Sequence, residues 1–179
     1  MLSNDEIFKV GHVLDDLRRY VGESEFGYRA QGLLAHVLLR IGCKIVSINP
    51  QGHPDIVAKL GSQTLLLQAK SIHGKVRRKG FTLEAEDLEG IHPKNDNTTG
   101  YLAVLDCILP ISWILVDYTR LIRQVLRPTH IISLYAMRNK DLSLECTEEF
   151  IELVIKHQSH IRNLYFHILS SRALRGEPL

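Results

Sequence analysis

The sequence of 179 residues has few cysteines, one tryptophan and almost no net charge. Its three cysteines, Cys43, Cys107 and Cys146, lie far apart and form no Cys-x-x-Cys pair, so we expect buried reduced thiols. The histidines show no His-x₃-His spacing, which argues against a zinc site. The composition therefore excludes a disulfide scaffold, and it is also unlike collagen or a coiled coil.

A long apolar run is also missing. The most apolar stretch, residues 101–118, contains Asp106, Pro110 and Asp117 and falls short of the ~20 clean residues that a membrane helix needs. The N-terminus is acidic where a signal peptide would be basic and then apolar. We therefore expect a soluble, cytoplasmic protein that does not enter a membrane.

The net charge of +2 is a cancellation between charged blocks. Residues 70–79 carry five bases and no acids, whereas residues 81–90 carry four acids and no bases. The same alternation recurs between residues 118–140, which are basic, and residues 141–153, which are acidic. The pattern predicts one positive face beside residues 70–79 and acidic surface elsewhere, so a nucleic-acid partner is not excluded.

The apolar periodicity predicts helices first, then strands, and a helix at the end. We expect helices over residues 4–20, 24–40, about 120–126 and 147–171, and strands over residues 43–49, 54–60, 64–70, 101–108 and 111–118. Residues 83–90 remain undecided. This order indicates a single α/β domain over residues 1–179, with an N-terminal helix in 1–22, a core in 24–118 and a C-terminal helix in 147–171.

The strands 54–60 and 64–70 form the most informative segment. Gly61-Ser62 suits a two-residue hairpin turn, in which facing positions have numbers that add up to 123. Asp55 then faces Gln68, and side-chain alternation points Gln68 and Lys70 the same way. The hairpin therefore gathers Asp55, Gln68 and Lys70 at its open end.

Two interpretations of this trio are open. Short polar clusters are common at strand ends, where Asp55 closes a turn and Lys70 is the first exposed residue of a loop. Alternatively, Asp55 and a neighbouring oxygen hold Mg²⁺ at a phosphoryl group, and Lys70 steadies the nucleophile or the developing charge.

The same residues resemble a known family. Gly-His-Pro-Asp-Ile-Val-Ala at residues 52–58 and Leu-Leu-Gln-Ala-Lys at residues 66–70 look like the Pro-Asp and acid-x-Lys motifs of the PD-(D/E)XK nuclease superfamily. Residues 28–43 resemble the helix that archaeal Holliday-junction resolvases and Mrr-type restriction endonucleases place before these strands. The resemblance covers about residues 24–75.

The resemblance implies a restriction-endonuclease-like three-layer domain, with a central mixed β-sheet flanked by helices. It implies a Mg²⁺- or Mn²⁺-dependent DNA endonuclease of restriction or junction-resolving type that hydrolyses phosphodiester bonds. Asp55 would be the main metal ligand, with Gln68 and the Ala69 carbonyl as weaker ligands, and Lys70 would stabilise the nucleophile or transition state. By analogy with nucleases that cut two strands, a homodimer is plausible.

This chain departs from the family pattern at two positions. Gln68 stands where the family usually has an acid, although Mrr-type members carry Gln-x-Lys there. Gln31, which we place at the rim of the site, stands where the family helix usually supplies a glutamate. Glu84 and Glu86 could fold back toward the site, which the sequence does not decide.

The basic segment after the hairpin has two interpretations. It is either a phosphate-contacting loop beside the cleavage site or a solvated basic loop. With His53, which precedes the Pro-Asp pair, the candidate nucleic-acid contacts are Lys75, Arg77, Arg78 and Lys79.

Two other classes of function remain. In the first, the nuclease fold is kept, but Gln31 and Gln68 have removed too much negative charge for catalysis, and the domain binds nucleic acid or a protein partner. In the second, the protein is structural, and its polar trio is only a strand end.

Overall fold

The computed structural model describes residues 3–73, 83–125 and 137–179. The chain is an α/β protein whose helices flank a mixed sheet of five strands. The helices are α1 (Asn4–Val21), α2 (Glu23–Arg40), α3 (Ala85–Gly90), α4 (Tyr118–Val125), α6 (Lys140–His157), the 3₁₀ helix η2 (Ile161–Asn163) and α7 (Phe166–Leu174). The strands are β1 (Lys44–Ile48), β2 (Ile56–Leu60), β3 (Gln63–Ile72), β4 (Thr98–Asp106) and β5 (Ser112–Asp117).

The strands lie side by side in chain order, β1-β2-β3-β4-β5. Only β3 and β4 are parallel, and the segment between them contains α3; the other neighbours are antiparallel. The β2–β3 hairpin has the register expected from the sequence, because Leu60 pairs with Gln63 and Val57 with Leu66. Gly61 has a φ of 60°, which the first position of this turn requires.

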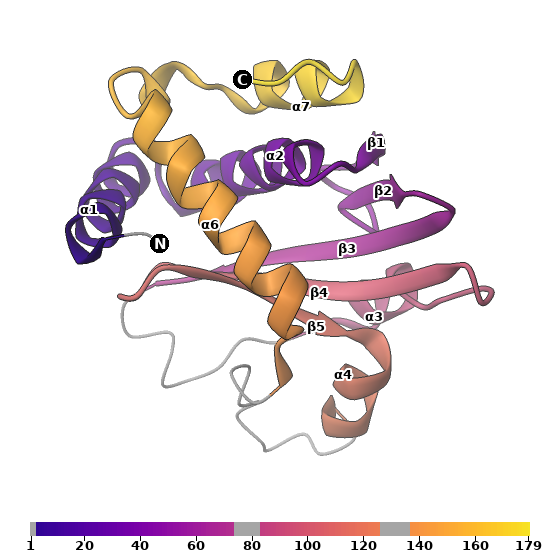
Figure 1. Ribbon diagram of the computed structural model, residues 1–179. Coiled ribbons are helices and arrows are strands. Elements are labelled where there is room, and N and C mark those ends of the chain that lie inside the picture. The colour runs from indigo at the N-terminus through magenta and orange to yellow at the C-terminus, as the bar shows by residue number, and fades with distance from the viewer. Residues whose placement is uncertain (1–2, 74–82, 126–136) are drawn as a thin grey trace.

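Helices cover both faces of the sheet (Figure 1). On one face α2 and α6 pack directly on the strands, with α1 beside them and α7 outside α2; on the other face lie α3 and α4. The alternation along β3 follows these layers: Leu65 and Leu67 belong to the core under α2, whereas Leu66 and Ile72 face the smaller core on the α3 side. Among the described residues, no helix is both long and apolar enough to span a bilayer.

The first two helices begin and end where the sequence indicates. The Ser3 side chain caps α1 by accepting the Glu6 backbone N–H, and Gly22 follows the helix with a φ of 84°. Gly42 after α2 also has a positive φ, 93°, which a residue with a side chain rarely adopts. These two glycines let the chain turn sharply, first from α1 into α2 and then from α2 into the sheet.

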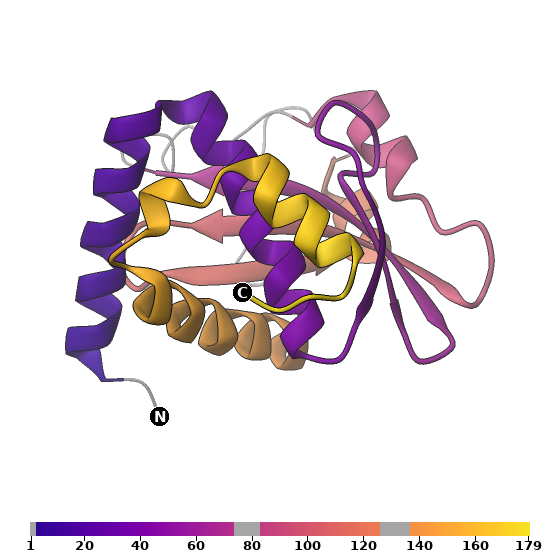
Figure 2. The ribbon, with the colours of Figure 1, turned by 90° about the horizontal axis from the view of Figure 1, so that it is seen from above.

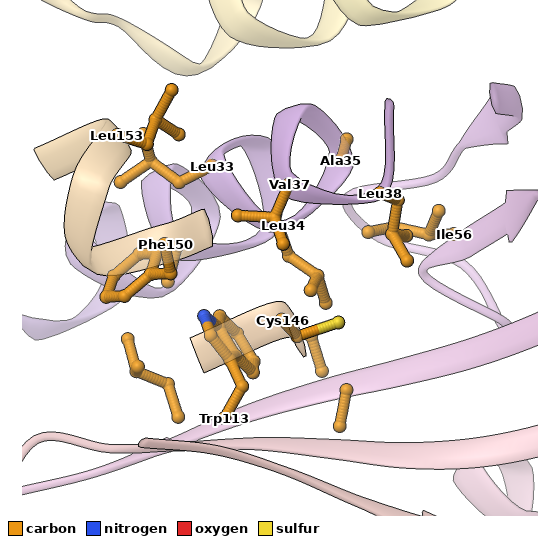
Figure 3. Close-up of a cluster of buried hydrophobic side chains, with 14 of the residues drawn as sticks. Leu33, Leu34, Ala35, Val37, Leu38, Ile56, Trp113, Cys146, Phe150 and Leu153 are labelled. Carbon is orange, nitrogen blue, oxygen red and sulfur yellow. The ribbon is translucent and has the colours of Figure 1, made fainter. Parts of the chain in front are cut away.

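The larger core lies between α2, α6 and the sheet (Figure 3). Trp113 on β5 meets Phe150 on α6 edge to face, with ring centroids 5.9 Å apart. Leu38 of α2 lies beside Ile56, the first residue of β2, and both are fully buried. The start of β2 is therefore held from above by α2, which fixes the position of the residue before it, Asp55.

The expected single helix over residues 147–171 is wrong. Its apolar positions divide between α6, which starts at Lys140, and α7, with the short helix η2 between them. Helix α6 begins earlier than predicted. Its first turn is stabilised by the Asn139 side chain, which caps the helix by accepting the Leu142 N–H. The chain breaks after His157 because its later apolar residues pack against α2 and the edge strand β1, away from the strands that α6 covers.

Helix α3 is held close to the loop before β2 by two glycines (Figure 2). A Cβ on Gly90 would lie 2.6 Å from the His53 Cβ, and a Cβ on Gly100 would lie 1.7 Å from the Ile91 carbonyl oxygen. Real Cβ atoms do not approach other atoms this closely, so the end of α3 fits between His53 and β4 only because both residues are glycine.

We expect Gly100→Ala to destabilise the protein by at least about 3 kcal/mol, because the new methyl group overlaps the backbone of Ile91. Urea unfolding measures the change. Gly27→Ala on α2 is the control: its Cβ would meet no other atom within 4 Å, and we expect a gain of roughly 0.5–1 kcal/mol. Equal stability of the Gly100→Ala variant and the parent would contradict the packing described here.

Candidate functional site

The site begins where β2 separates from β3. In an extended ladder, the Ala69 N–H would bond to the backbone of residue 54. Instead the Pro54 carbonyl accepts from Asn49 Nδ2 at 3.1 Å, and the Asp55 carboxylate accepts the Ala69 N–H at 2.7 Å. The Asp55 carbonyl in turn accepts the Asn49 N–H at 2.7 Å, which closes the loop between β1 and β2. The Asp55 side chain therefore takes the place of a ladder bond and is fixed against β3.

The Asp55 carboxyl group is held at an electrostatic cost. It is only 4% exposed, and burial, together with the negative charge of Asp87, raises its pKa from 3.8 to about 6. The Ala69 N–H, Lys70 and His53 act in the opposite direction on this pKa, but they do not compensate for the burial. A carboxylate in such a place gains from any further cation that reaches it.

The structure brings Gln68, Lys70 and His53 together with Asp55 on the side of the sheet that faces α3. Lys70 Nζ donates to both oxygens of Asp87, at 2.9 and 3.2 Å. His53 Nδ1 lies 3.2 Å from Gln68 Oε1 and 3.4 Å from Asp87 Oδ1. Because both neighbours are acceptors, Nδ1 carries the hydrogen, and Nε2 is the nitrogen that can accept a proton when the ring is neutral.

Asp87 is the residue that the sequence did not predict. It is 2% exposed, and its carboxylate also accepts the Glu84 N–H at 3.0 Å. The sequence pointed to the right segment but to Glu84 and Glu86, which are exposed. The signal that could have found Asp87 is its place three residues after Glu84, because the third residue of a helix turns back toward the helix start.

The other predicted site residues are Gln31 and four bases of the segment after β3. Gln31 lies on α2, which covers the opposite face of the sheet, and it is 9% exposed. Among the described residues, its Oε1 has no hydrogen-bond partner. No contact tests its expected place at the rim of the site, which stays a prediction. The four predicted phosphate contacts of the basic segment, Lys75, Arg77, Arg78 and Lys79, lie outside the described residues.

The charge pattern predicted that the acidic block lies away from the hairpin. The structure places it next to the hairpin instead. Helix α3 places Asp87 in the site and the exposed side chains of Glu86 and Glu89 next to His53. The reason is topological: β3 and β4 are parallel, so the chain has to return along the sheet between them, and α3 lies on that return path. Lys70 of the basic block therefore meets Asp87 of the acidic block.

The oxygens at the site suit a hard divalent cation. The Asp55 and Asp87 carboxylates, the Gln68 amide and the Ala69 carbonyl offer oxygen alone, which is the ligand type of Mg²⁺ and Mn²⁺. The described part of the chain contains no group of three acidic, histidine or cysteine side chains placed to hold a metal. Mg²⁺ needs only one or two carboxylates when water and substrate phosphate complete its shell, so the donor set fits.

A groove of about 580 Å³ adjoins the site, and His53 lies at the boundary between the two. It is lined by the half-buried Thr64 and Leu66 of β3, by residues of α3 and by the chain that leads into β4. His53 therefore borders both the carboxylate cluster and the groove.

Comparison of the chain with protein-family models, with curated proteins and with solved structures gives no significant match.

The raised pKa of Asp55 predicts how stability depends on pH. The folded pKa of about 6 lies above the unfolded value of 3.8, so the native state holds this proton more tightly. Stability from this group is therefore greatest below about pH 4, falls as the pH rises to 6, and is then constant, a loss of roughly 3 kcal/mol.

We expect Asp55→Asn to raise the free energy of unfolding at pH 7.5 by about 1–3 kcal/mol and to change it little at pH 4, because the amide keeps the acceptor for Ala69 without the charge. Urea titrations at the two pH values measure this. Asp96→Asn, at an exposed turn, is the control and should have no effect. A destabilised Asp55→Asn protein at pH 7.5 would contradict the strain assigned to the carboxylate.

Proposed function

We propose that this protein is a Mg²⁺- or Mn²⁺-dependent endonuclease of the PD-(D/E)XK type, with a restriction-endonuclease-like fold, that hydrolyses phosphodiester bonds in DNA. The observation that carries the proposal is the convergence of Asp55, Gln68 and Lys70 at the open end of the β2–β3 hairpin, with a second buried carboxylate, Asp87, in contact with Lys70. The layered mixed sheet supports it. A homodimer and a cytoplasmic location belong to the same proposal.

The second carboxylate answers the main objection to catalysis. With Gln68 in place of the family acid, the sequence left Asp55 as the one certain carboxylate of the site. Asp87 adds a negative charge close enough to Asp55 to raise its pKa, as a pair that shares one cation requires. The acid that would stand at residue 68 is thus supplied from α3.

Each side chain of the group then has a role. Asp55 and Asp87 would hold the cation with help from the Gln68 amide and the Ala69 carbonyl, and the cation would supply positive charge to the phosphate under attack. Lys70, kept in place by Asp87, presents its ammonium group to the developing negative charge. His53 Nδ1 is engaged by Gln68 and Asp87, so Nε2 is the ring nitrogen that would take a proton from the attacking water.

We expect the purified protein to cleave supercoiled or branched DNA with Mg²⁺ or Mn²⁺, and Asp55→Ala and Lys70→Ala each to lower the rate at least about 100-fold. The rate should rise with pH through 6, because the pKa of about 6 at Asp55 governs cation binding. Electrophoresis of the cut products measures the rate. Lys59→Ala, an exposed lysine on the same hairpin, is the matched control and should cleave normally. Cleavage that survives both site substitutions would rule out this mechanism.

The role of Asp87 has a test of its own. Asp87→Asn should lower both Mn²⁺ affinity and cleavage at least about tenfold, because a ligand charge is lost. Adding Gln68→Glu to that variant returns a carboxylate to the strand position and should restore part of both. Glu148→Gln, an exposed acid on α6, controls for overall charge. If Asp87→Asn binds Mn²⁺ as the parent does, Asp87 is only a partner of Lys70.

A second candidate function is a nuclease-fold module that binds nucleic acid or a protein without cutting. Two observations favour it: Lys70 is neutralised by Asp87, and the described residues hold no three-residue acidic, histidine or cysteine cluster for a metal. Calorimetric titration with Mg²⁺ and Mn²⁺, with and without DNA, separates the candidates. Heat of cation binding in either condition supports the nuclease, and its absence in both supports the module.

A further inference from the structure

We propose that the groove beside His53 is a nucleotide subsite that binds one unpaired base, preferably a base with amino donors on its Watson–Crick edge. The inference rests on the proposed function, because it names the part of the substrate that would lie next to the attacked phosphate. The residues that line the groove and the position of the groove beside the site support it.

The groove has the size and the surfaces that a base needs. Its volume of about 580 Å³ exceeds that of one nucleotide, and its floor includes the apolar side chain of Leu66. Pro54 and His53 also line the groove, and their rings are of a kind on which a base can stack. Thr64 and Thr98 bring hydroxyl groups from the two parallel strands β3 and β4.

The charges in the groove favour a base over a phosphate. Glu86 and Glu89, three residues apart on α3, both line the same wall. Two carboxylates repel a phosphate but accept N–H groups, and one carboxylate can pair with the two adjacent donors of guanine. Uracil and thymine offer one N–H between two carbonyl oxygens, which a carboxylate repels. Lys94 on the opposite wall is placed for the backbone of the same nucleotide.

The position of the groove also fits a substrate strand. His53 contacts Gln68 and Asp87 in the catalytic cluster and lines the groove, so the two sites share one side chain. A strand whose phosphate lies at the Lys70 end therefore has its neighbouring nucleotide within reach of the groove. A base in the groove has left its partner strand, so the inference makes the substrate locally unpaired at the point of cleavage.

The experiment measures nucleotide binding without metal or cleavage. The full-length protein, kept free of metal with a chelator, is titrated with GMP, CMP, AMP and UMP and followed by NMR chemical shifts. We expect GMP to bind at least about tenfold more tightly than UMP, the discrimination that one bidentate pair provides. Glu86→Gln/Glu89→Gln should remove this preference, and Glu145→Gln/Glu148→Gln, two exposed acids on α6, should keep it.

A second variant tests the place of binding. Thr64→Phe fills the floor of the groove and should abolish binding of all four nucleotides, whereas Gln63→Phe, at the neighbouring exposed position of β3, should leave it unchanged. Equal binding of GMP and UMP, no binding of either, or a preference that survives the double glutamine variant would overturn the inference. A protein that binds GMP in this way but cuts no DNA would refute the nuclease proposal and leave the subsite standing.

Discussion

The hydrogen bond from the Ala69 amide to the buried Asp55 carboxylate determines the rest of the site. It ends the pairing of β2 with β3 at a defined residue, and the loop that carries His53 leaves the sheet there. Beyond that point β3 pairs, within the described part of the chain, with β4 alone, and side-chain alternation directs Gln68 and Lys70 toward α3. A side chain that replaces a ladder bond thus opens the sheet without leaving an amide unpaired.

This arrangement buries a negative charge in the protein interior, which is energetically unfavourable. A buried carboxylate with a pKa near 6 weakens the native state at neutral pH, and a second buried carboxylate beside it adds to the effect. Strand ends that serve only structure have no need of such a pair. Clusters of this kind are typical of sites whose energy is recovered when a ligand binds, which agrees with the function proposed above.

The features that could be predicted from the sequence are mainly those that depend on residues close together in the chain. The Ser3 cap, the positive φ of Gly42 and the hairpin register at Gly61 depend on neighbours in the chain, and all three could be predicted. Asp87 is different: its place three residues after Glu84 fits a helix start, but its contact with Lys70 depends on where the return path from β3 to β4 places α3.

The error over residues 147–171 has the same origin. The apolar spacing of α6 and α7 is similar, but one packs on the sheet and the other on the outside of α2, where a Cβ on Gly32 would press against Leu169. Periodicity reports that a residue is buried and does not report against which surface. Gln31 illustrates the limit again: it is buried on α2, and periodicity does not report which residues surround it.

The position of Trp113 has a practical consequence for work on this protein. It is the one tryptophan of the chain, it is 1% exposed, and its ring packs against Phe150 on the face of the sheet opposite Lys70 and α3. Its fluorescence therefore reports on the contact between α6 and the sheet. A titration of the cluster around Asp55 leaves this emission unchanged as long as the layers stay together, so a shift in its wavelength marks loss of the fold and not occupation of the site.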